Sequence, residues 1–294
     1  MNLTSWSYHT SAGITLRGWH SPPTGKPVLH FLHGNGLSTR VYTPLLELLS
    51  ADFDLWLCDI QGHGESDAGD VFLGWNQNAA LAVEAFQAQR SLFADVPVYA
   101  SAHSFGGVLT SLIMAQHPHL FRAAVLLDPI VFPPLAQAYM KTKELLGLKI
   151  FNTLAQRTLV RRSHWPDRQA AYASLTGRGT FKGWTTQALR AYVDHALRPA
   201  DEEGVQLKCP VWLEAKIFST APRRLWSLLR QVQAPVLFMY GRTTYPVVLK
   251  SAALWPRCNA HVTAELVEGG HCFMQEYPAA TAQRVRDFLL TTRG

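Results

Sequence analysis

Cysteine is scarce in this sequence, and the four that occur are scattered. Cys58, Cys209, Cys258 and Cys272 show no metal-ligand spacing, so we expect no metal site. The first residues, Met1–Trp6, contain neither a basic start nor an apolar run, so we expect no signal peptide. Free thiols in a cytoplasmic protein are the simplest interpretation.

Charged residues and long apolar runs are also few. Charged residues make up 16% of the 294 residues, whereas 48% are hydrophobic. This composition excludes a disordered chain and allows a large buried core, in one large domain or two moderate ones. No stretch approaches the roughly 18 apolar residues of a membrane span, so we expect no transmembrane segment.

Positive charge is concentrated in one segment. Residues 133–225 hold 15 Lys and Arg against 7 Asp and Glu, whereas the rest of the chain holds 12 and 14. The ordinary interpretation is a solvated basic face. The alternative is attraction of an anionic substrate or membrane surface through Arg157, Arg161, Arg162 and Arg168. No nucleic-acid-binding motif is present, so we expect no nucleic-acid partner.

Short apolar segments alternate with helical patterns in the first half of the chain. The predicted strands are 13–19, 27–32, 52–58, 96–100 and 121–127. The predicted helices are 42–49, 76–93 and 105–117. Near-continuous apolar runs separated by helices indicate an α/β fold with a parallel sheet covered on both faces.

This alternation stops after Asp128 and resumes near residue 234. The segment between is helix-like, basic and aromatic, with helical patterns over 135–156 and 185–197. Further strands are predicted at 234–241 and 261–267. We therefore predict a core formed by 1–132 and 226–294, with an inserted helical segment at 133–225.

The segment Tyr99–Gly107 carries the strongest functional signal. Ser104 lies where a strand passes into a helical pattern, with Ala102 two residues before it and Gly106 two residues after it. A tight strand-to-helix turn strains the serine backbone, and only small neighbours avoid a clash there. The pattern is that of a nucleophile elbow, with Ala102 in place of a glycine. We predict that Ser104 is a nucleophile.

Other candidates also follow strands, where ligands bind in open α/β sheets. His271 follows the last strand after Gly269 and Gly270, and the order of nucleophile first and histidine last favours it as the general base. The loop at Asn35 could present its backbone N–H. Together with the N–H of Phe105 it would form an oxyanion hole; an ordinary glycine turn is the alternative.

Taken together, these features resemble the α/β-hydrolase superfamily. The resemblance rests on the loops at 33–36, 59–66 and 269–271 and on the elbow at Ser104; His63 in the second loop is interpreted as structural. It implies an eight-stranded, mostly parallel sheet with a cap inserted after strand six, a Ser-His-acid triad, and acyl-ester chemistry without a cofactor. Serine at the nucleophile position argues against haloalkane dehalogenase and epoxide hydrolase relatives, which use aspartate.

The acid departs from the common pattern of the superfamily. Most members carry Asp shortly after the glycine that ends strand seven, but Gly241–Lys250 contains no carboxylate. Some members place the acid after strand six, where this chain has Asp128. Asp128 is the sole candidate at a suitable strand end, and the alternative is a loop-capping aspartate before proline. Glu268 and Glu276 do not lie at positions that the family uses.

Two features of the inserted segment bear on the substrate. Glu214 is a lone carboxylate that either joins a structural ion pair or faces the pocket. Aromatic residues could line an apolar acyl pocket or pack the segment itself: Tyr139, Phe151, Trp165, Tyr172, Phe181, Trp184 and Trp212.

We therefore predict a serine hydrolase that cleaves a small-molecule carboxylic ester through an acyl-enzyme on Ser104. His271 would be the base, and Asp128 would orient it. Lactone, thioester and carbon–carbon bond hydrolysis use the same arrangement and stay open. A non-catalytic ligand-binding protein on the same scaffold is the alternative, supported by the missing carboxylate after strand seven. Nothing in the sequence indicates the oligomeric state.

Overall fold

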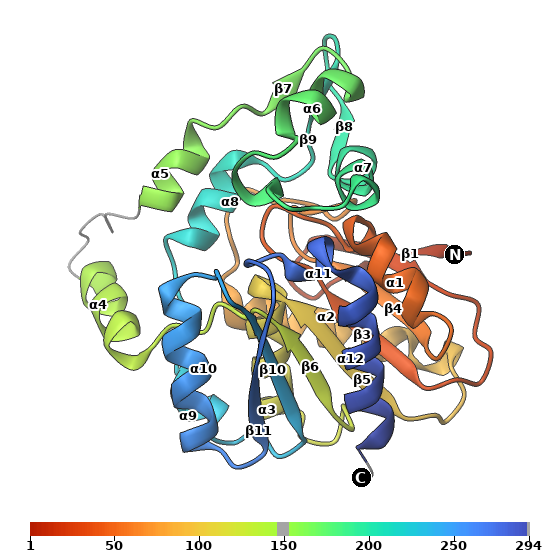
Figure 1. The fold of residues 1–294 in the computed structure, drawn as a ribbon, viewed down its shortest axis with the longest axis vertical. Helices are drawn as coiled ribbons and strands as arrows, with labels where there is room; N and C mark the ends of the chain where they lie inside the picture. The colour runs from red at the N-terminus through yellow and green to blue at the C-terminus, as the bar shows by residue number, and fades with distance from the viewer. Residues whose placement is uncertain (146–152, 293–294) are drawn as a thin grey trace.

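The computed structural model describes residues 1–145 and 153–292. Its centre is an eight-stranded sheet (Figure 1). In spatial order the strands are β1 (Thr4–His9), β2 (Thr15–His20), β4 (Asp54–Asp59), β3 (Val28–Leu32), β5 (Val98–His103), β6 (Ala124–Leu127), β10 (Val236–Gly241) and β11 (Val262–Val267). Only the β1–β2 and β2–β4 pairings in this sheet are antiparallel. The predicted mostly parallel sheet of eight strands is confirmed.

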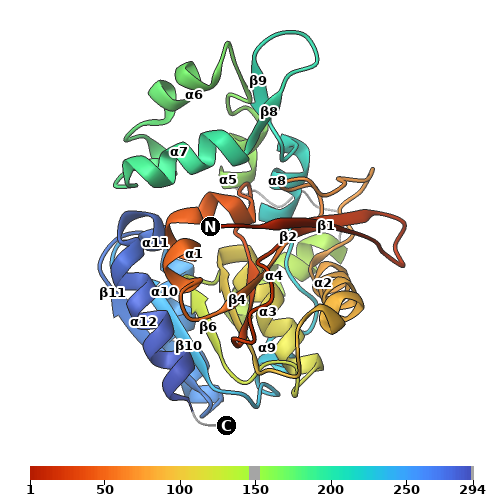
Figure 2. The same cartoon turned by 90° about the vertical axis from the view of Figure 1, so that its right-hand side faces the viewer.

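Helices cover both faces of this sheet (Figures 1 and 2). One face packs against α2 (Trp75–Gln89), α3 (Ser104–Gln116), α9 (Leu225–Leu229) and α10 (Pro246–Cys258). The other packs against α1 (Thr43–Leu49) and α12 (Pro278–Thr291). Every residue of β3, β4, β5 and β6 is buried, because helices lie on both sides of these strands. This explains their unbroken apolar sequences.

The predicted elements of the first half correspond closely to the observed ones. The predicted helix at 42–49 is a 3-10 turn, η1 (Thr39–Tyr42), followed by α1, and that at 76–93 is α2 followed by η2 (Arg90–Leu92). The predicted strands coincide with β2 to β6 within a few residues. Strand β1, which pairs with β2 at the sheet edge, was not predicted.

The described part of the chain between β6 and α9 lies mostly over the end of the sheet where the parallel strands finish (Figure 1). Its described elements are α4 (Pro134–Leu145), α5 (Thr153–Leu159), β7 (His164–Trp165), α6 (Arg168–Leu175), η3 (Gly179–Phe181), α7 (Thr186–His195), β8 (Leu197–Pro199), β9 (Val205–Leu207) and α8 (Val211–Phe218). The predicted helix at 185–197 is α7. The predicted helix at 135–156 covers α4 and the start of α5, and residues 146–152 lie outside the described part.

The inserted segment also contains a small sheet that the sequence did not predict. Strands β7, β9 and β8 form a three-stranded sheet whose pairings are antiparallel. Strands of two or three residues are too short to show an apolar–polar alternation in the sequence. Across residues 1–145 and 153–292, the helices are all too short or too polar to span a membrane.

Candidate active site

Ser104 occupies the sharp turn between β5 and α3. Its φ of 54° lies in the left-handed region, which is costly for a residue with a side chain. The turn is held from behind, because the Gly106 amide donates to the His33 carbonyl at 3.0 Å. A Cβ at Gly106 would lie 2.5 Å from that same oxygen, so no larger residue fits. The elbow pattern therefore has its expected geometry.

Three side chains from separate strand ends form one hydrogen-bonded series. Nε2 of His271 lies 3.0 Å from Oγ of Ser104, and its Nδ1 lies 2.6 Å from Oδ2 of Asp128. A carboxylate accepts, so Nδ1 carries the proton and Nε2 is free to accept one from Ser104. The structure thus brings together the three residues that the sequence singled out.

Asp128 is fully buried and held by further donors. The Gly241 amide donates to its Oδ1 at 2.8 Å, and the Thr244 hydroxyl donates to its Oδ2. Both donors come from the end of β10, where most relatives carry the acid. Asp128 directly follows β6, and the residues after β10, which include no carboxylate up to Lys250, instead donate hydrogen bonds to it.

The loop after β3 passes directly beside Ser104. A Cβ at Gly34 would lie 3.3 Å from Cβ of Ser104. The amide of Phe105 lies in the first turn of α3, where amides have no helical acceptor. In the described part of the chain the amide of Asn35 makes no hydrogen bond either. Both predicted oxyanion donors therefore have an N–H that is unpaired within the described residues.

His33 fixes the orientation of the peptide that carries the Asn35 amide. The Ile60 amide donates to Nε2 of His33 at 2.9 Å, so Nδ1 carries the proton and donates to the Gly34 carbonyl at 2.8 Å. That carbonyl and the Asn35 N–H belong to one planar trans peptide and point in opposite directions. Burial lowers the pKa of His33 to about 4, which keeps the ring neutral.

His63 supports the next residue of the same loop. Its Nε2 accepts from the Gly36 amide at 3.0 Å, and its Nδ1 lies 2.9 Å from the Gln61 carbonyl. Burial lowers the pKa of His63 to about 3. A buried, neutral imidazole with both nitrogens engaged agrees with its interpretation as a structural residue.

Two further residues at this site escaped sequence analysis, namely Tyr42 and His103. The Tyr42 hydroxyl contacts both the Gly34 amide and Nδ1 of His103. Both side chains are buried. His103 is adjacent to Ser104 in the sequence, but nothing in the sequence indicates its partners.

Glu214 of α8 is buried and forms an ion pair with the partly buried Arg161 beside the oxyanion loop. Its Oε1 lies 2.7 Å from Nη1 of Arg161, and Nη2 of Arg161 donates to the Tyr192 hydroxyl at 3.2 Å. The carboxylate packs on Gly36, where a Cβ would lie 2.7 Å from Oε1. Burial raises the pKa of Glu214, and Arg161 opposes this shift. The carbonyl of Glu214 also accepts from Nδ2 of Asn35 at 3.0 Å.

Two other arginines and several aromatic residues of the inserted segment are engaged in local contacts, whereas Arg157 is exposed. Arg162 donates to the His164 carbonyl and Arg168 to the Val193 carbonyl. Four of the aromatic residues pack into the core between the segment and the sheet: Trp165, Tyr172, Phe181 and Trp184. Tyr139 and Trp212 are 53% and 39% exposed, and Phe151 lies outside the described residues. The aromatic character of the segment therefore reflects packing to a large extent.

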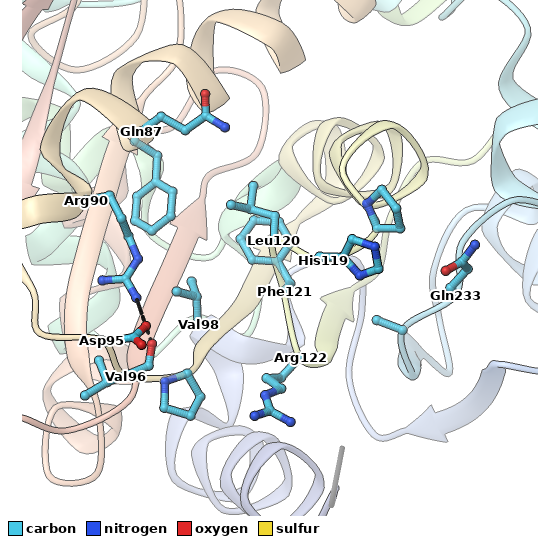
Figure 3. Close-up of a pocket in the computed structure, with 14 residues that line it drawn as sticks. Gln87, Arg90, Asp95, Val96, Val98, His119, Leu120, Phe121, Arg122 and Gln233 are labelled. Carbon is cyan, nitrogen blue, oxygen red and sulfur yellow. Dashed lines mark hydrogen bonds and ion pairs between the residues drawn. The ribbon is translucent and has the colours of Figure 1, made fainter.

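A cavity of about 750 Å³ lies at the opposite end of the sheet (Figure 3). Val98, Phe121 and Gln233, which line it, sit at or before the starts of β5, β6 and β10. Ser104 and Asp128 follow the ends of β5 and β6. Because these strands are parallel, the cavity is separated from the site by the length of the sheet and plays no part in it.

Comparison with known proteins agrees with this arrangement. The profile of the alpha/beta hydrolase family matches residues 31–284. The chain belongs to this family. The crystal structure of E-2-(acetamidomethylene)succinate hydrolase superposes on this α/β hydrolase with a TM-score of 0.78 at 22% identity, covering 99% of this chain and 100% of that chain.

Two curated relatives illustrate the range of this α/β hydrolase's neighbours. The 2-(acetamidomethylene)succinate hydrolase of Mesorhizobium japonicum is 26% identical over 268 residues, covering 90% of this chain and 88% of the relative. The monoglyceride lipase of Mus musculus is 28% identical over 144 residues. That match spans 47% of this chain and 46% of the lipase, less than half of either protein.

Proposed function

We propose that this α/β hydrolase is a serine hydrolase that cleaves carboxylic esters through an acyl-enzyme on Ser104. The observation that carries the proposal is the series Ser104–His271–Asp128, with contacts of 3.0 and 2.6 Å. A serine hydroxyl is a poor nucleophile until a base accepts its proton. Here the base is in contact with the hydroxyl and is held in the required tautomer by the acid.

Each group has a defined role in the reaction. Oγ of Ser104 attacks the ester carbonyl while Nε2 of His271 takes the hydroxyl proton, and Asp128 stabilises the resulting imidazolium. The amides of Asn35 and Phe105 donate to the oxyanion that forms on the carbonyl oxygen. His271 then returns the proton to the leaving alkoxide. A water molecule, activated by the same histidine, attacks the acyl-enzyme and releases the carboxylic acid and free Ser104.

The segment 133–225 would act as a cap over this site, because its helices α5 to α8 lie above the strand ends that carry the three residues (Figure 1). An ester substrate is supported by the resemblance to monoglyceride lipase. The longer match to 2-(acetamidomethylene)succinate hydrolase makes an acetamido-bearing succinate a compound worth including in a substrate panel.

The test is a panel of p-nitrophenyl esters of different acyl length, measured on the wild type and on Ser104→Ala. We expect turnover in the wild type and a loss on the order of 10⁴-fold or more in kcat for Ser104→Ala. A fluorophosphonate probe should label the wild type and not the variant. Turnover that survives Ser104→Ala would refute the proposal. A wild type that neither turns over esters nor reacts with the probe would favour the non-catalytic ligand-binding protein.

A further inference from the structure

Tyr42 and His103 connect the loop that carries Asn35 to the loop that carries His271. The Gly34 amide donates to the Tyr42 hydroxyl at 3.0 Å, and this hydroxyl lies 2.6 Å from Nδ1 of His103. On the other side of the ring, Nε2 of His103 lies 3.0 Å from the main-chain oxygen of His271. These contacts form one continuous series between the two loops.

The chemistry of the groups fixes the direction of every bond in the series. A carbonyl oxygen only accepts, so Nε2 of His103 carries a proton and donates a hydrogen bond to the His271 carbonyl. Nδ1 of His103 is then an acceptor, and the Tyr42 hydroxyl donates to it. The hydroxyl oxygen accepts from Gly34. Every polar atom in the series is paired, and the imidazole of His103 must be neutral for this to hold.

The surroundings leave the series little freedom. Tyr42 is 0% exposed and His103 is 1% exposed. A Cβ at Gly34 would lie 2.6 Å from Nδ1 of His103, so the loop backbone packs directly on the ring. The ring centroids of His103 and His271 are 4.7 Å apart. Burial and the neighbouring His271 hold the pKa of His103 well below its usual value, which agrees with the neutral form that the hydrogen bonds require.

We propose that Tyr42 and His103 are positioning residues that hold the oxyanion loop and His271 in a fixed relation to Ser104. The inference rests on the proposed function. An oxyanion donor must lie about 2.7–3.1 Å from the developing charge, and a misplacement of about 1 Å can cost on the order of 100-fold in rate. We call the pair Tyr42 and His103 the bridge. It acts on the Asn35 amide through the adjacent Gly34, and on the proposed base through the main-chain oxygen of His271.

The primary test is Tyr42→Phe, which removes one hydroxyl and keeps the ring that packs on Phe31. We expect kcat for a p-nitrophenyl ester to fall roughly 10- to 100-fold while KM stays within about threefold. The Ki of a trifluoromethyl ketone, whose adduct carries the oxyanion, should rise in parallel with the loss in kcat/KM. Tyr8→Phe is the matched control, since Tyr8 lies on the edge strand β1 and its hydroxyl contacts Glu84 of α2. It should change none of these constants.

A second variant approaches the bridge from its other side. His103→Asn retains an acceptor near the position of Nδ1 but lacks the donor to His271. We expect the same split between kcat and KM, together with a shift of the pH limb of kcat/KM that reports the base. If Tyr42→Phe does not fold, this variant decides the question. Folded variants whose kcat falls less than twofold would overturn the bridge.

An NMR measurement separates this inference from the proposed function. The proton on Nδ1 of His271, hydrogen-bonded to Asp128 at 2.6 Å, should give a resolved downfield resonance that moves in Tyr42→Phe and not in Tyr8→Phe. This readout needs no turnover. A wild type without Ser104-dependent ester hydrolysis would refute the proposed function alone, whereas an unmoved resonance would refute the bridge alone.

Discussion

The Thr244 hydroxyl donates a hydrogen bond to Oδ2 of Asp128, the same oxygen that accepts from Nδ1 of His271. Two strand ends thus meet at one carboxylate oxygen. Asp128, the proposed acid, lies at the end of β6, and the loop after β10 contributes the Thr244 hydroxyl. A carboxylate at position 244 would therefore reach the same place from the other side.

Asp128→Asn should lower kcat on the order of 10⁴-fold, because an amide at this position favours the wrong tautomer of His271. The double variant Asp128→Asn/Thr244→Asp should recover at least tenfold of this loss, since its carboxylate again faces Nδ1. Steady-state kinetics with a p-nitrophenyl ester measure both effects. Thr244→Asp in the wild-type background is the control and should not activate the protein. A double variant no faster than Asp128→Asn would show that the acid cannot act from β10.

Gly106→Ala should destabilise the protein through a steric contact rather than through backbone conformation. The new Cβ would lie 2.5 Å from the His33 carbonyl oxygen and 2.7 Å from the Leu32 carbonyl, and neither backbone atom can rotate away. We expect a loss of about 3 kcal/mol of unfolding free energy, measured by urea denaturation. Gly25→Ala is the control, because its φ is 86° and no atom lies within 4 Å. It should cost only about 1–2 kcal/mol; equal losses in the two variants would contradict the steric explanation.

Arg161→Met should be strongly destabilising, because it leaves the carboxylate of Glu214 buried without its partner. Breaking a fully buried pair costs about 3–5 kcal/mol, and we expect about 2–3 kcal/mol here because the Arg161 side chain is partly exposed. Arg161→Met/Glu214→Gln should recover much of this. The comparison is Arg242→Met, which breaks the exposed pair with Glu268 and should leave the melting temperature unchanged.

The pH dependence of Arg161→Met distinguishes charge from packing. Burial raises the pKa of Glu214, and removal of Arg161 raises it further. A carboxyl with a raised pKa in the folded state opposes folding as the pH rises above its unfolded value. The stability deficit of Arg161→Met should therefore shrink as the pH falls from 7 toward 5. A deficit independent of pH would indicate lost packing instead.

The protein should lose stability below neutral pH because it buries several neutral histidines. Burial lowers the pKa of His30 to about 3, of His33 to about 4 and of His63 to about 3. The unfolded chain takes up protons on these rings below about pH 6.5, whereas the folded chain does so only near pH 3–4. Each ring should therefore cost about 1.4 kcal/mol for each pH unit below 6.5.

Urea denaturation between pH 5 and 8 measures this loss, and His30→Leu isolates one ring. In the described part of the chain, neither ring nitrogen of His30 has a hydrogen-bond partner, and the ring stacks on Trp56. The leucine variant should fold, and the slope of its unfolding free energy with pH should be smaller by the uptake of about one proton. Stability that is flat from pH 5 to 7 would contradict the whole expectation.

The parallel strands, the helices between the first of them and the three residues of the proposed triad could be predicted from sequence for one physical reason. Parallel strands between helices are apolar throughout, so their ends are visible, and their carboxyl ends meet at one edge of the sheet. Ser104, Asp128 and His271 each follow such an end. Asn35 and Phe105 also follow strand ends, those of β3 and β5, and were therefore predicted beside them.

Residues whose role depends on contacts between distant loops could not be found in this way. Tyr42 and His103 are 61 residues apart, and Arg161 and Glu214 are 53 apart, with no pattern that links either pair. The short strands β7 to β9 likewise depend on pairing that leaves no periodic signal. Glu214 was expected either in an ion pair or in the pocket, and only the fold shows the partner.

The cavity at the far end of the sheet offers a place for attachment chemistry. A strand of six residues such as β5 spans about 20 Å, so a group fixed at Gln233 would stand well away from Ser104. Three of the native thiols are buried and Cys258 is partly exposed, so Cys258→Ser with Gln233→Cys would create one addressable thiol. Immobilisation through it would leave the opposite end of the sheet, with Ser104 and the inserted segment, turned toward the solution.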